Sequence, residues 1–105
     1  MPKTTKIHVD KCDNELIMLA VPVSGPGAGL GSFELLHLTS GFNNPVNYEV
    51  VPQSVLPPGD YTLVAVGVNW GGPSQFHATL TGPGTQISFA VPGVGAQSQS
   101  VPMTV

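Results

Sequence analysis

The sequence contains no arginine, and its basic residues are three lysines near the start of the chain, Lys3, Lys6 and Lys11. No charged residue follows Asp60, and the formal net charge is −3. A nucleic-acid-binding surface gains most of its affinity from lysine and arginine side chains that neutralise phosphates. Anionic membranes attract basic clusters for the same reason. The composition therefore argues against nucleic acids and anionic membranes as partners.

Cysteine is also scarce, because Cys12 stands alone and can form no intramolecular disulfide. A lone cysteine more often packs as a small hydrophobic residue than acts as a nucleophile. His8, Asp10 and Cys12 would share one face of a continuing strand, but no CxxC or HxxxH partner follows them. The acidic residues are too scattered for a calcium site. We therefore expect neither a metal site nor a cofactor.

Long apolar runs are absent as well. Proline, glycine or a polar residue interrupts every run before the roughly 18 residues that a membrane-spanning helix needs. The first residues show no apolar segment and no small-residue cleavage site, so we expect a cytoplasmic protein or one released without a classical signal peptide. Nucleophile elbows, phosphate-binding loops and dinucleotide fingerprints are missing too. We expect a non-enzymatic protein without a membrane span.

What the sequence does contain is the pattern of an all-β protein. The 11 prolines and 13 glycines recur every few residues, and the segments between them are rich in valine, threonine, phenylalanine and leucine. This pattern predicts a single domain over residues 1–105, an antiparallel β-sandwich or jelly roll of about eight short strands. The predicted strands are Thr5–Asp10, Glu15–Val23, Ser32–Thr39, Asn47–Val51, Asp60–Trp70, Gln75–Thr81, Gln86–Val91 and Ser100–Val105.

Alternation of apolar and polar residues indicates how these strands are buried. Phe76, Ala78 and Leu80 fall on one face of their strand and predict a core-facing side. The strand at residues 60–70 is apolar on both faces, so we expect it to be central in its sheet or covered on both sides. Residues 94–100 carry little pattern, and we expect them to be disordered.

One segment resembles a known family. Residues 56–72 read LPPGDYTLVAVGVNWGG, a proline-glycine turn followed by a tyrosine and alternating valines. The segment is similar to the E–F corner, F strand and F–G turn of fibronectin type III and other immunoglobulin-like β-sandwich domains. The resemblance implies that Tyr61 is a corner tyrosine, whose hydroxyl hydrogen-bonds back across the corner. It covers about one sixth of the chain, lacks the early-strand tryptophan of that family, and favours an architecture rather than a function.

The first candidate site surrounds Trp70. Binding a neutral sugar in water needs an aromatic face for the C–H side of the ring, and amide or hydroxyl groups for its hydroxyls. Trp70 lies where a predicted strand meets a Gly-Gly-Pro turn, and the polar residues close to it in sequence are Asn69, Ser74, Gln75 and His77. An alternative is that Trp70 lies in the core, because it shares its strand face with Val64, Val66 and Val68. Parity alone favours that alternative.

A second loop, residues 42–48, offers the same chemistry through Asn43, Asn44 and Tyr48, although asparagine-rich loops are also ordinary turns. The uncharged second half of the chain suits a neutral, hydroxyl-rich ligand or contact with identical chains. We therefore expect a lectin-like, non-enzymatic module that binds a neutral polar ligand, a carbohydrate, and acts as a homo-oligomer. The alternative is a structural or protein-interaction immunoglobulin-like sandwich with a protein partner and no small-molecule ligand.

Overall fold

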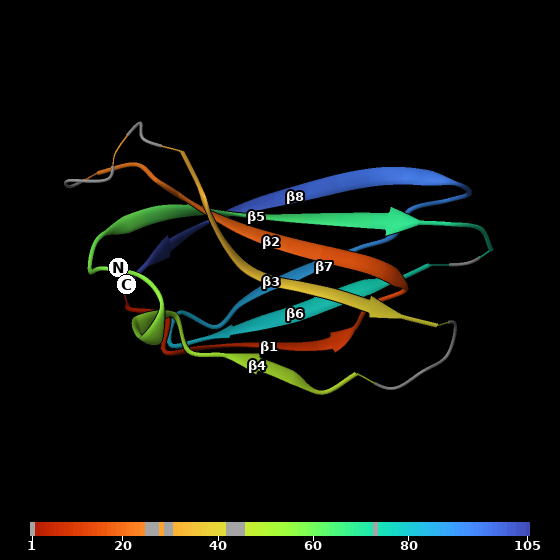
Figure 1. Cartoon of the computed structure of the whole chain (residues 1–105). Coiled ribbons are helices and arrows are strands. Elements are labelled where there is room, and N and C mark those ends of the chain that lie inside the picture. Colours follow the sequence, from red (N-terminus) through yellow and green to blue (C-terminus); the bar gives the residue numbers. More distant parts are fainter. Residues whose placement is uncertain (1, 25–27, 29–30, 42–45, 73) are drawn as a thin grey trace.

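A computed structural model describes residues 2–24, 28, 31–41, 46–72 and 74–105. These residues form two antiparallel four-stranded sheets that pack face to face as a β-sandwich (Figure 1). One sheet has the order β4-β1-β6-β7 and the other has the order β3-β2-β5-β8. The fold class expected from the sequence is confirmed. The elements are β1 (Lys6–Lys11), β2 (Asn14–Pro22), β3 (Phe33–Ser40), β4 (Tyr48–Val50), the short 3-10 helix η1 (Pro52–Ser54), β5 (Asp60–Asn69), β6 (Phe76–Thr81), β7 (Thr85–Phe89) and β8 (Gly95–Thr104).

The strand directions decide which connections lie together. Consecutive strands alternate in direction, so the β1–β2, β3–β4, β5–β6 and β7–β8 connections all lie at one end of the sandwich, on the right of Figure 1. The remaining connections and both termini lie at the opposite end. The end that carries the β1–β2, β3–β4, β5–β6 and β7–β8 connections is called the loop end below. It carries both segments in which the sequence predicted binding residues, around Trp70 and around Tyr48.

The core lies between the two sheets, where the alternating side chains predicted it. Phe76, Ala78 and Leu80 are fully buried, and Ile87 on the neighbouring β7 joins them. From the opposite sheet, the buried residues are Leu16, Met18, Ala20, Leu36, Tyr61, Leu63, Ala65, Val101 and Met103. The period of two along each strand therefore determines which side chains the sandwich encloses.

The last strand is longer than the sequence predicted. We expected residues 94–100 to be disordered, and this is wrong, because β8 begins at Gly95 and pairs with the whole of β5. The ladder runs from the pair Asn69 and Gly95 to the pair Asp60 and Thr104. Most side chains of residues 95–100 are exposed, so backbone pairing with β5 orders this segment and leaves no apolar pattern in the sequence.

The central position predicted for β5 is confirmed, since it lies between β2 and β8. Its inward face, however, is the one that carries Leu63 and Ala65. Val64, Val66 and Val68 face outward and are partly exposed. Trp70 has the same parity as these valines and is 59% exposed. The expectation that parity favours a core Trp70 is therefore wrong, because the valine stripe is the outer stripe.

The corner before β5 is closed by a hydrogen bond from Tyr61. Its hydroxyl donates to the carbonyl oxygen of Pro57, with 2.6 Å between the two oxygens. The ring is buried, and the bond spans four residues of the turn that leads into β5. This is the contact expected of a corner tyrosine. It describes the local corner and by itself assigns the chain to no family.

Candidate functional site

Trp70 is the most exposed aromatic residue that the structure describes, and its backbone is firmly held. It directly follows the last residue of β5, and its backbone N–H donates to Oδ1 of Asn14 at the start of β2, 2.8 Å away. Val94, directly before β8, is 79% exposed and lies at the same end. The loop end therefore presents an indole ring to solvent from an anchored backbone position.

Asn69, next to this indole, is itself buried, with 1% of its surface exposed. Its Nδ2 lies 2.8 Å from the carbonyl oxygen of Gly72, 2.9 Å from that of Val91 and 2.6 Å from that of Gly93. Its Oδ1 accepts a hydrogen bond from the Gly71 N–H at 3.0 Å. These bonds engage the whole side-chain amide. Asn69 therefore joins the β5–β6 and β7–β8 connections and shapes the loop that carries Trp70.

Ser74 has a comparable position. Its hydroxyl donates to the carbonyl oxygen of Val91 at 2.7 Å and accepts from the N–H of the same residue at 3.0 Å. The hydroxyl of Ser74 therefore satisfies both backbone groups of Val91, as a neighbouring strand would. Like Asn69, it supports the loop end from within.

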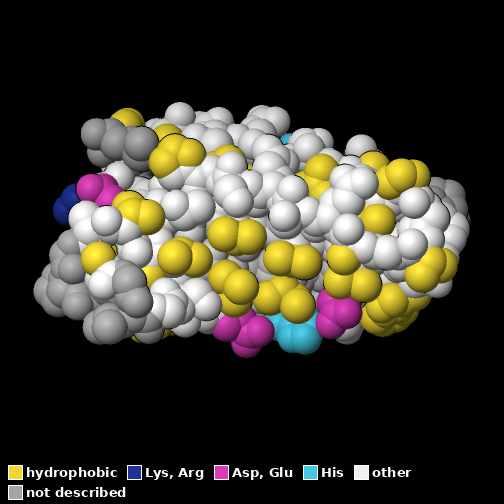
Figure 2. Space-filling model, turned by 90° about the horizontal axis from the view of Figure 1, so that it is seen from above, with side chains coloured by type: hydrophobic (Ala, Val, Ile, Leu, Met, Phe, Trp, Pro, Cys, Tyr) yellow, Lys and Arg dark blue, Asp and Glu magenta, His cyan; other side chains and the backbone are white. Residues whose placement is uncertain are grey.

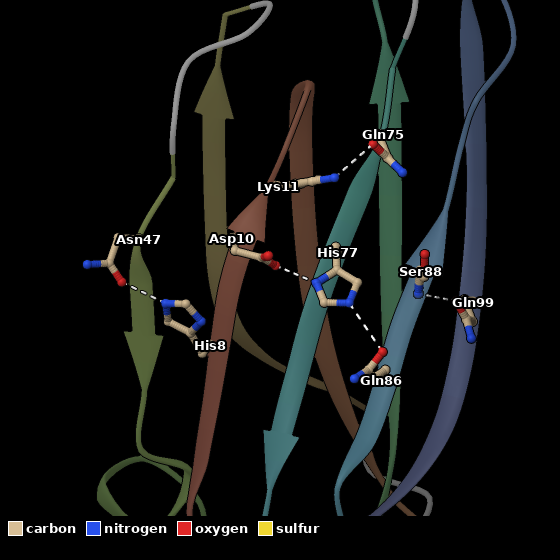
Figure 3. Close-up of polar contacts among 9 residues, drawn as sticks. All are labelled: His8, Asp10, Lys11, Asn47, Gln75, His77, Gln86, Ser88 and Gln99. Atoms are coloured by element: carbon tan, nitrogen blue, oxygen red, sulfur yellow. Dashed lines mark hydrogen bonds and ion pairs between the residues drawn. The ribbon is translucent and has the colours of Figure 1, made fainter.

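Gln75 and His77 belong to a different surface, the outer side of the β4-β1-β6-β7 sheet (Figure 3). Oε1 of Gln75 accepts a hydrogen bond from Lys11 Nζ at 3.2 Å. The Nδ1–H of His77 donates to Asp10, and Nε2 of the same ring lies 3.4 Å from Oε1 of Gln86. The ring thus links β1, β6 and β7. The structure does not bring His77 to the indole of Trp70.

Ser88 lies directly opposite His77 in the pairing of β6 with β7. An aspartate, a histidine and a serine on three neighbouring strands raise the question of an activated nucleophile. Nε2 of His77 points toward Gln86, however, and not toward Ser88 (Figure 3). The backbone N–H of Ser88 donates to Gln99. A nucleophile must be within hydrogen-bond reach of its base, and the described contacts of His77 are with two other residues. We therefore interpret the contacts of Asp10, His77 and Ser88 as surface hydrogen bonds that link neighbouring strands.

Tyr48 lies beside a hollow at the loop end, between the end of β3 and the start of β4. The hollow has a volume of about 510 Å³, and its described lining contains no charged residue. It is lined by Leu38, Thr39, Ser40, Gly41, Val46, Asn47 and Tyr48. Its size falls within the range of small-ligand sites. The predicted site residues Asn43 and Asn44 lie outside the described residues.

The lining of this hollow combines one aromatic ring with amide and hydroxyl groups. Tyr48 is 40% exposed, and Oδ1 of the neighbouring Asn47 accepts a hydrogen bond of 2.6 Å from the His8 ring. Thr39 and Ser40 were not among the residues predicted from the sequence. Their only signal was their position at the end of a predicted strand, directly before the asparagine-rich loop. They are polar groups that a ligand in the hollow would meet.

The hollow and Trp70 are connected through Asn14. Its side chain holds the backbone of Trp70, and its backbone pairs with Ser40 in the ladder between β2 and β3. The backbones of Trp70 and Ser40 are therefore separated by two strand spacings, or about 10 Å. This link reaches the hollow at Ser40, whereas Tyr48, which also lines the hollow, belongs to β4 in the other sheet.

Cys12, also near this end, does not provide a reactive thiol. It is 3% exposed, and burial raises its pKa to about 11, with smaller contributions from the charges of Asp13 and Glu15. Among the described residues, no three histidine, cysteine, aspartate or glutamate side chains lie close enough together to hold a metal ion. The described chain also includes no helix of the length and hydrophobicity that a membrane crossing requires.

No family model, curated protein or solved structure matches this chain.

Proposed function

We propose that the chain is a non-enzymatic binding module for a neutral polar ligand, a carbohydrate, which binds at the loop end. The single observation that carries the proposal is the exposed indole of Trp70, whose anchored backbone lies two strand spacings from an uncharged hollow. Tryptophan is enriched at binding interfaces, because its ring combines a large apolar face with an N–H that can hydrogen-bond. Here the Trp70 backbone lies two strand spacings from Ser40, whose hydroxyl belongs to the lining of the hollow.

The chemistry of these groups matches that of a sugar ring. A pyranose has an apolar C–H side that covers an aromatic face, and hydroxyls that need hydrogen-bond donors and acceptors on the protein. Thr39, Ser40 and Asn47 supply such groups along the hollow. Since the described lining carries no charge, the site favours an uncharged ligand over a phosphate or a carboxylate. Such a site is shallow and weak by itself, and oligomers raise the overall affinity through multivalency.

The test uses Trp70 both as a probe and as the site of mutation, because it is the only tryptophan of the chain. Its fluorescence emission is recorded during titrations with a panel of neutral monosaccharides and oligosaccharides. We expect an emission maximum typical of an exposed indole and a saturable change with at least one sugar. For that sugar, calorimetry should show an affinity at least about tenfold lower in Trp70→Ala, a loss of about 1.4 kcal/mol or more.

Two controls separate binding from folding. Trp70→Ala removes an exposed side chain, so its free energy of unfolding should stay within about 1 kcal/mol of the unsubstituted protein. Val94→Ala, an exposed apolar residue at the same end, should bind the sugar normally. The site assignment is wrong if the Trp70→Ala protein is folded and binds with unchanged affinity. A panel of sugars without any response contradicts the carbohydrate proposal itself.

The alternative function, a protein-interaction sandwich without a small ligand, is favoured by a different observation. Val64, Val66 and Val68 form a partly exposed apolar stripe along the outside of β5. Under this alternative, the sugar panel gives no response, whereas substitutions on that stripe weaken binding of a different protein. The two functions therefore differ in which surface the mutations must reach.

A further inference from the structure

The outer face of the β3-β2-β5-β8 sheet carries an apolar band, visible along the middle of Figure 2. It consists of six partly exposed side chains on the two central strands, Ile17, Leu19 and Val21 on β2 and Val64, Val66 and Val68 on β5. The opposite sheet presents polar residues on its outer face, as Figure 3 shows. Only one of the two sheet faces therefore offers a flat apolar surface of this kind among the described residues. Contiguous apolar patches on a soluble surface commonly mark an interaction site.

The two long sides of this band differ in charge. On the β3 side, the His37 ring contacts the carboxylate of Glu15, and its Nδ1 lies 3.9 Å from Glu34. These acids and the histidine form the coloured row along one border of the band in Figure 2. On the β8 side, the outward residues opposite β5 are Ala96, Ser98, Ser100 and Pro102, none of which is charged. One border thus accepts hydrogen bonds and the other can donate them.

The strand registers arrange these residues in straight rows across the sheet. His37, Ile17, Val66 and Ser98 are consecutive partners from β3 to β8 and form the central row. In the next row, the same pairings place Glu34, Leu19, Val64 and Ser100 side by side. These two rows read charged or ionisable, apolar, apolar, hydroxyl. The row next to His37 on the loop-end side differs and reads Thr39, Glu15, Val68 and Ala96.

This pattern is self-complementary under one rotation. A twofold axis along the strands, between β2 and β5, keeps each row at its level and reverses its direction. Ile17 then meets Val66 of a second copy, and His37 meets Ser98 of that copy. A twofold axis across the strands would instead place the acidic border on the acidic border of the other copy. The first arrangement therefore avoids like charges, places the acidic border against the serine hydroxyls of β8, and sets Glu15 opposite Val68 of the other copy.

We propose that this face binds the same face of a second copy of the chain about the twofold axis along the strands. Four strand spacings by seven residues give a surface of about 19 Å by 23 Å, or roughly 900 Å² for the two copies together. That area is typical of a weak dimer rather than an obligate one. Buried area does not determine affinity, so the test below covers a wide range of concentrations.

The arrangement has a consequence for ligand binding. Because the axis runs along the strands, both loop ends of the dimer point in the same direction, and the two Trp70 side chains face one surface together. This consequence rests on the proposed function, whereas the dimer itself does not. Two sites on one side can bind a multivalent glycan surface with higher avidity than either site alone.

The first test measures mass in solution by analytical ultracentrifugation, from about 5 to 500 μM. We expect the mass to rise with concentration from 10.8 kDa toward twice that value. In Val66→Lys, a charge lies at the centre of the face, and the dissociation constant should increase at least about 100-fold. Thr79→Lys, the matched control on the outer face of the other sheet, should dimerise normally.

The second test measures the direction of the axis. Packed sheets lie about 10 Å apart, so a short bis-maleimide can join cysteines on facing strands. A mixture of His37→Cys and Ser98→Cys proteins should give a cross-linked dimer. Neither variant alone should cross-link above the unsubstituted protein, whose only cysteine, Cys12, is buried.

Each other outcome overturns the proposal. A protein that remains a monomer at about 500 μM excludes this face as an interface. Equal dissociation constants for Val66→Lys and Thr79→Lys exclude it too. Cross-linking of His37→Cys with itself would indicate the axis across the strands. If Val66→Lys does not fold, Val66→Thr keeps a β-branched side chain and must still weaken the dimer. These measurements contain no sugar, so they test the dimer independently of the Trp70 site. Either proposal can be wrong while the other is right.

Discussion

The side-chain nitrogen of Asn69 lies 2.9 Å from the carbonyl oxygen of Val91, and this contact joins the end of β5 to the connection before β8. The same nitrogen also lies within 2.8 Å of the carbonyl oxygens of Gly72 and Gly93. Two N–H bonds of one amide thus serve three carbonyl groups, of which only that of Val91 has a second donor in the described part of the chain, the hydroxyl of Ser74. A residue that the sequence assigned to ligand binding is therefore the central hydrogen-bonding residue of the loop end.

Replacing Asn69 should destabilise the protein without removing any solvent-facing group. Asn69→Ala removes the donor to the carbonyl oxygens of Gly72 and Gly93 and leaves that of Val91 with Ser74 alone, so it should lower the free energy of unfolding by about 1 to 3 kcal/mol. Chemical denaturation measures this loss. Asn47→Ala, at an exposed position, is the control and should change stability by less than about 0.5 kcal/mol. Equal effects of the two substitutions would contradict this role of Asn69.

Tyr61 and Tyr48 form a matched pair for testing the corner hydrogen bond. Tyr61→Phe removes only the hydroxyl that donates to Pro57 and should lower the free energy of unfolding by about 1 kcal/mol. Tyr48→Phe removes the hydroxyl of an exposed ring and should leave stability unchanged. Thermal unfolding of both variants makes the comparison. A Tyr61→Phe protein as stable as Tyr48→Phe would show that the corner does not depend on this bond.

Gly67 provides space for two aromatic rings. A Cβ atom at this position would lie 2.7 Å from ring carbons of both Phe76 and Phe89, whose ring centroids are 5.0 Å apart. Gly67→Ala should therefore cost about 1 to 3 kcal/mol of stability through overpacking.

The cause of that loss can be checked in a double-mutant cycle. Phe89→Leu removes one of the two rings, so Gly67→Ala should cost less in the Phe89→Leu background than alone. Additive losses would indicate that the strand, and not the ring contact, requires the glycine.

Cys12 predicts a loss of stability in alkaline solution. Burial raises its pKa from 9.0 to about 11, so the folded state favours the neutral thiol. That preference contributes fully below pH 9, where the thiol is neutral in both states, and it is lost as the pH rises to 11. Cys12→Ala should therefore lose less stability than the unsubstituted protein between pH 9 and 11, by roughly 1 to 2 kcal/mol. Parallel curves of unfolding free energy against pH for the two proteins would contradict this. A thiol reagent at pH 8 should likewise react slowly until denaturant is added.

Sequence alone predicted the strands well, because turn residues and alternation are local signals. The bounds of β5 agree with the prediction to within one residue, whereas β8 begins five residues before the predicted start. That segment, residues 95–100, shows no alternation, since its order comes from pairing with β5. Backbone hydrogen bonds to a distant strand do not require a particular side chain, so they produce no pattern in the sequence.

The candidate site divides in the same way. Trp70 and Tyr48 could be named from residue chemistry, and both are exposed at the loop end. The roles of Asn69 and Ser74 could not be named, because a sequence does not show whether an amide or a hydroxyl faces solvent or a neighbouring loop. The grouping of Thr39 with Tyr48 around one hollow likewise depends on the crossing from β3 to β4.

The sequence by itself determined the all-β class, the positions of most strands, the uncharged second half and the residue types available for binding. These properties follow from the local rules of turn formation, alternation and charge. The tertiary structure alone decided which stripe of β5 faces the core, because Leu63 and Val64 are equally apolar and only the partner sheet distinguishes them. It thereby placed Trp70 and the valines outside, where a sugar or a second copy can reach them.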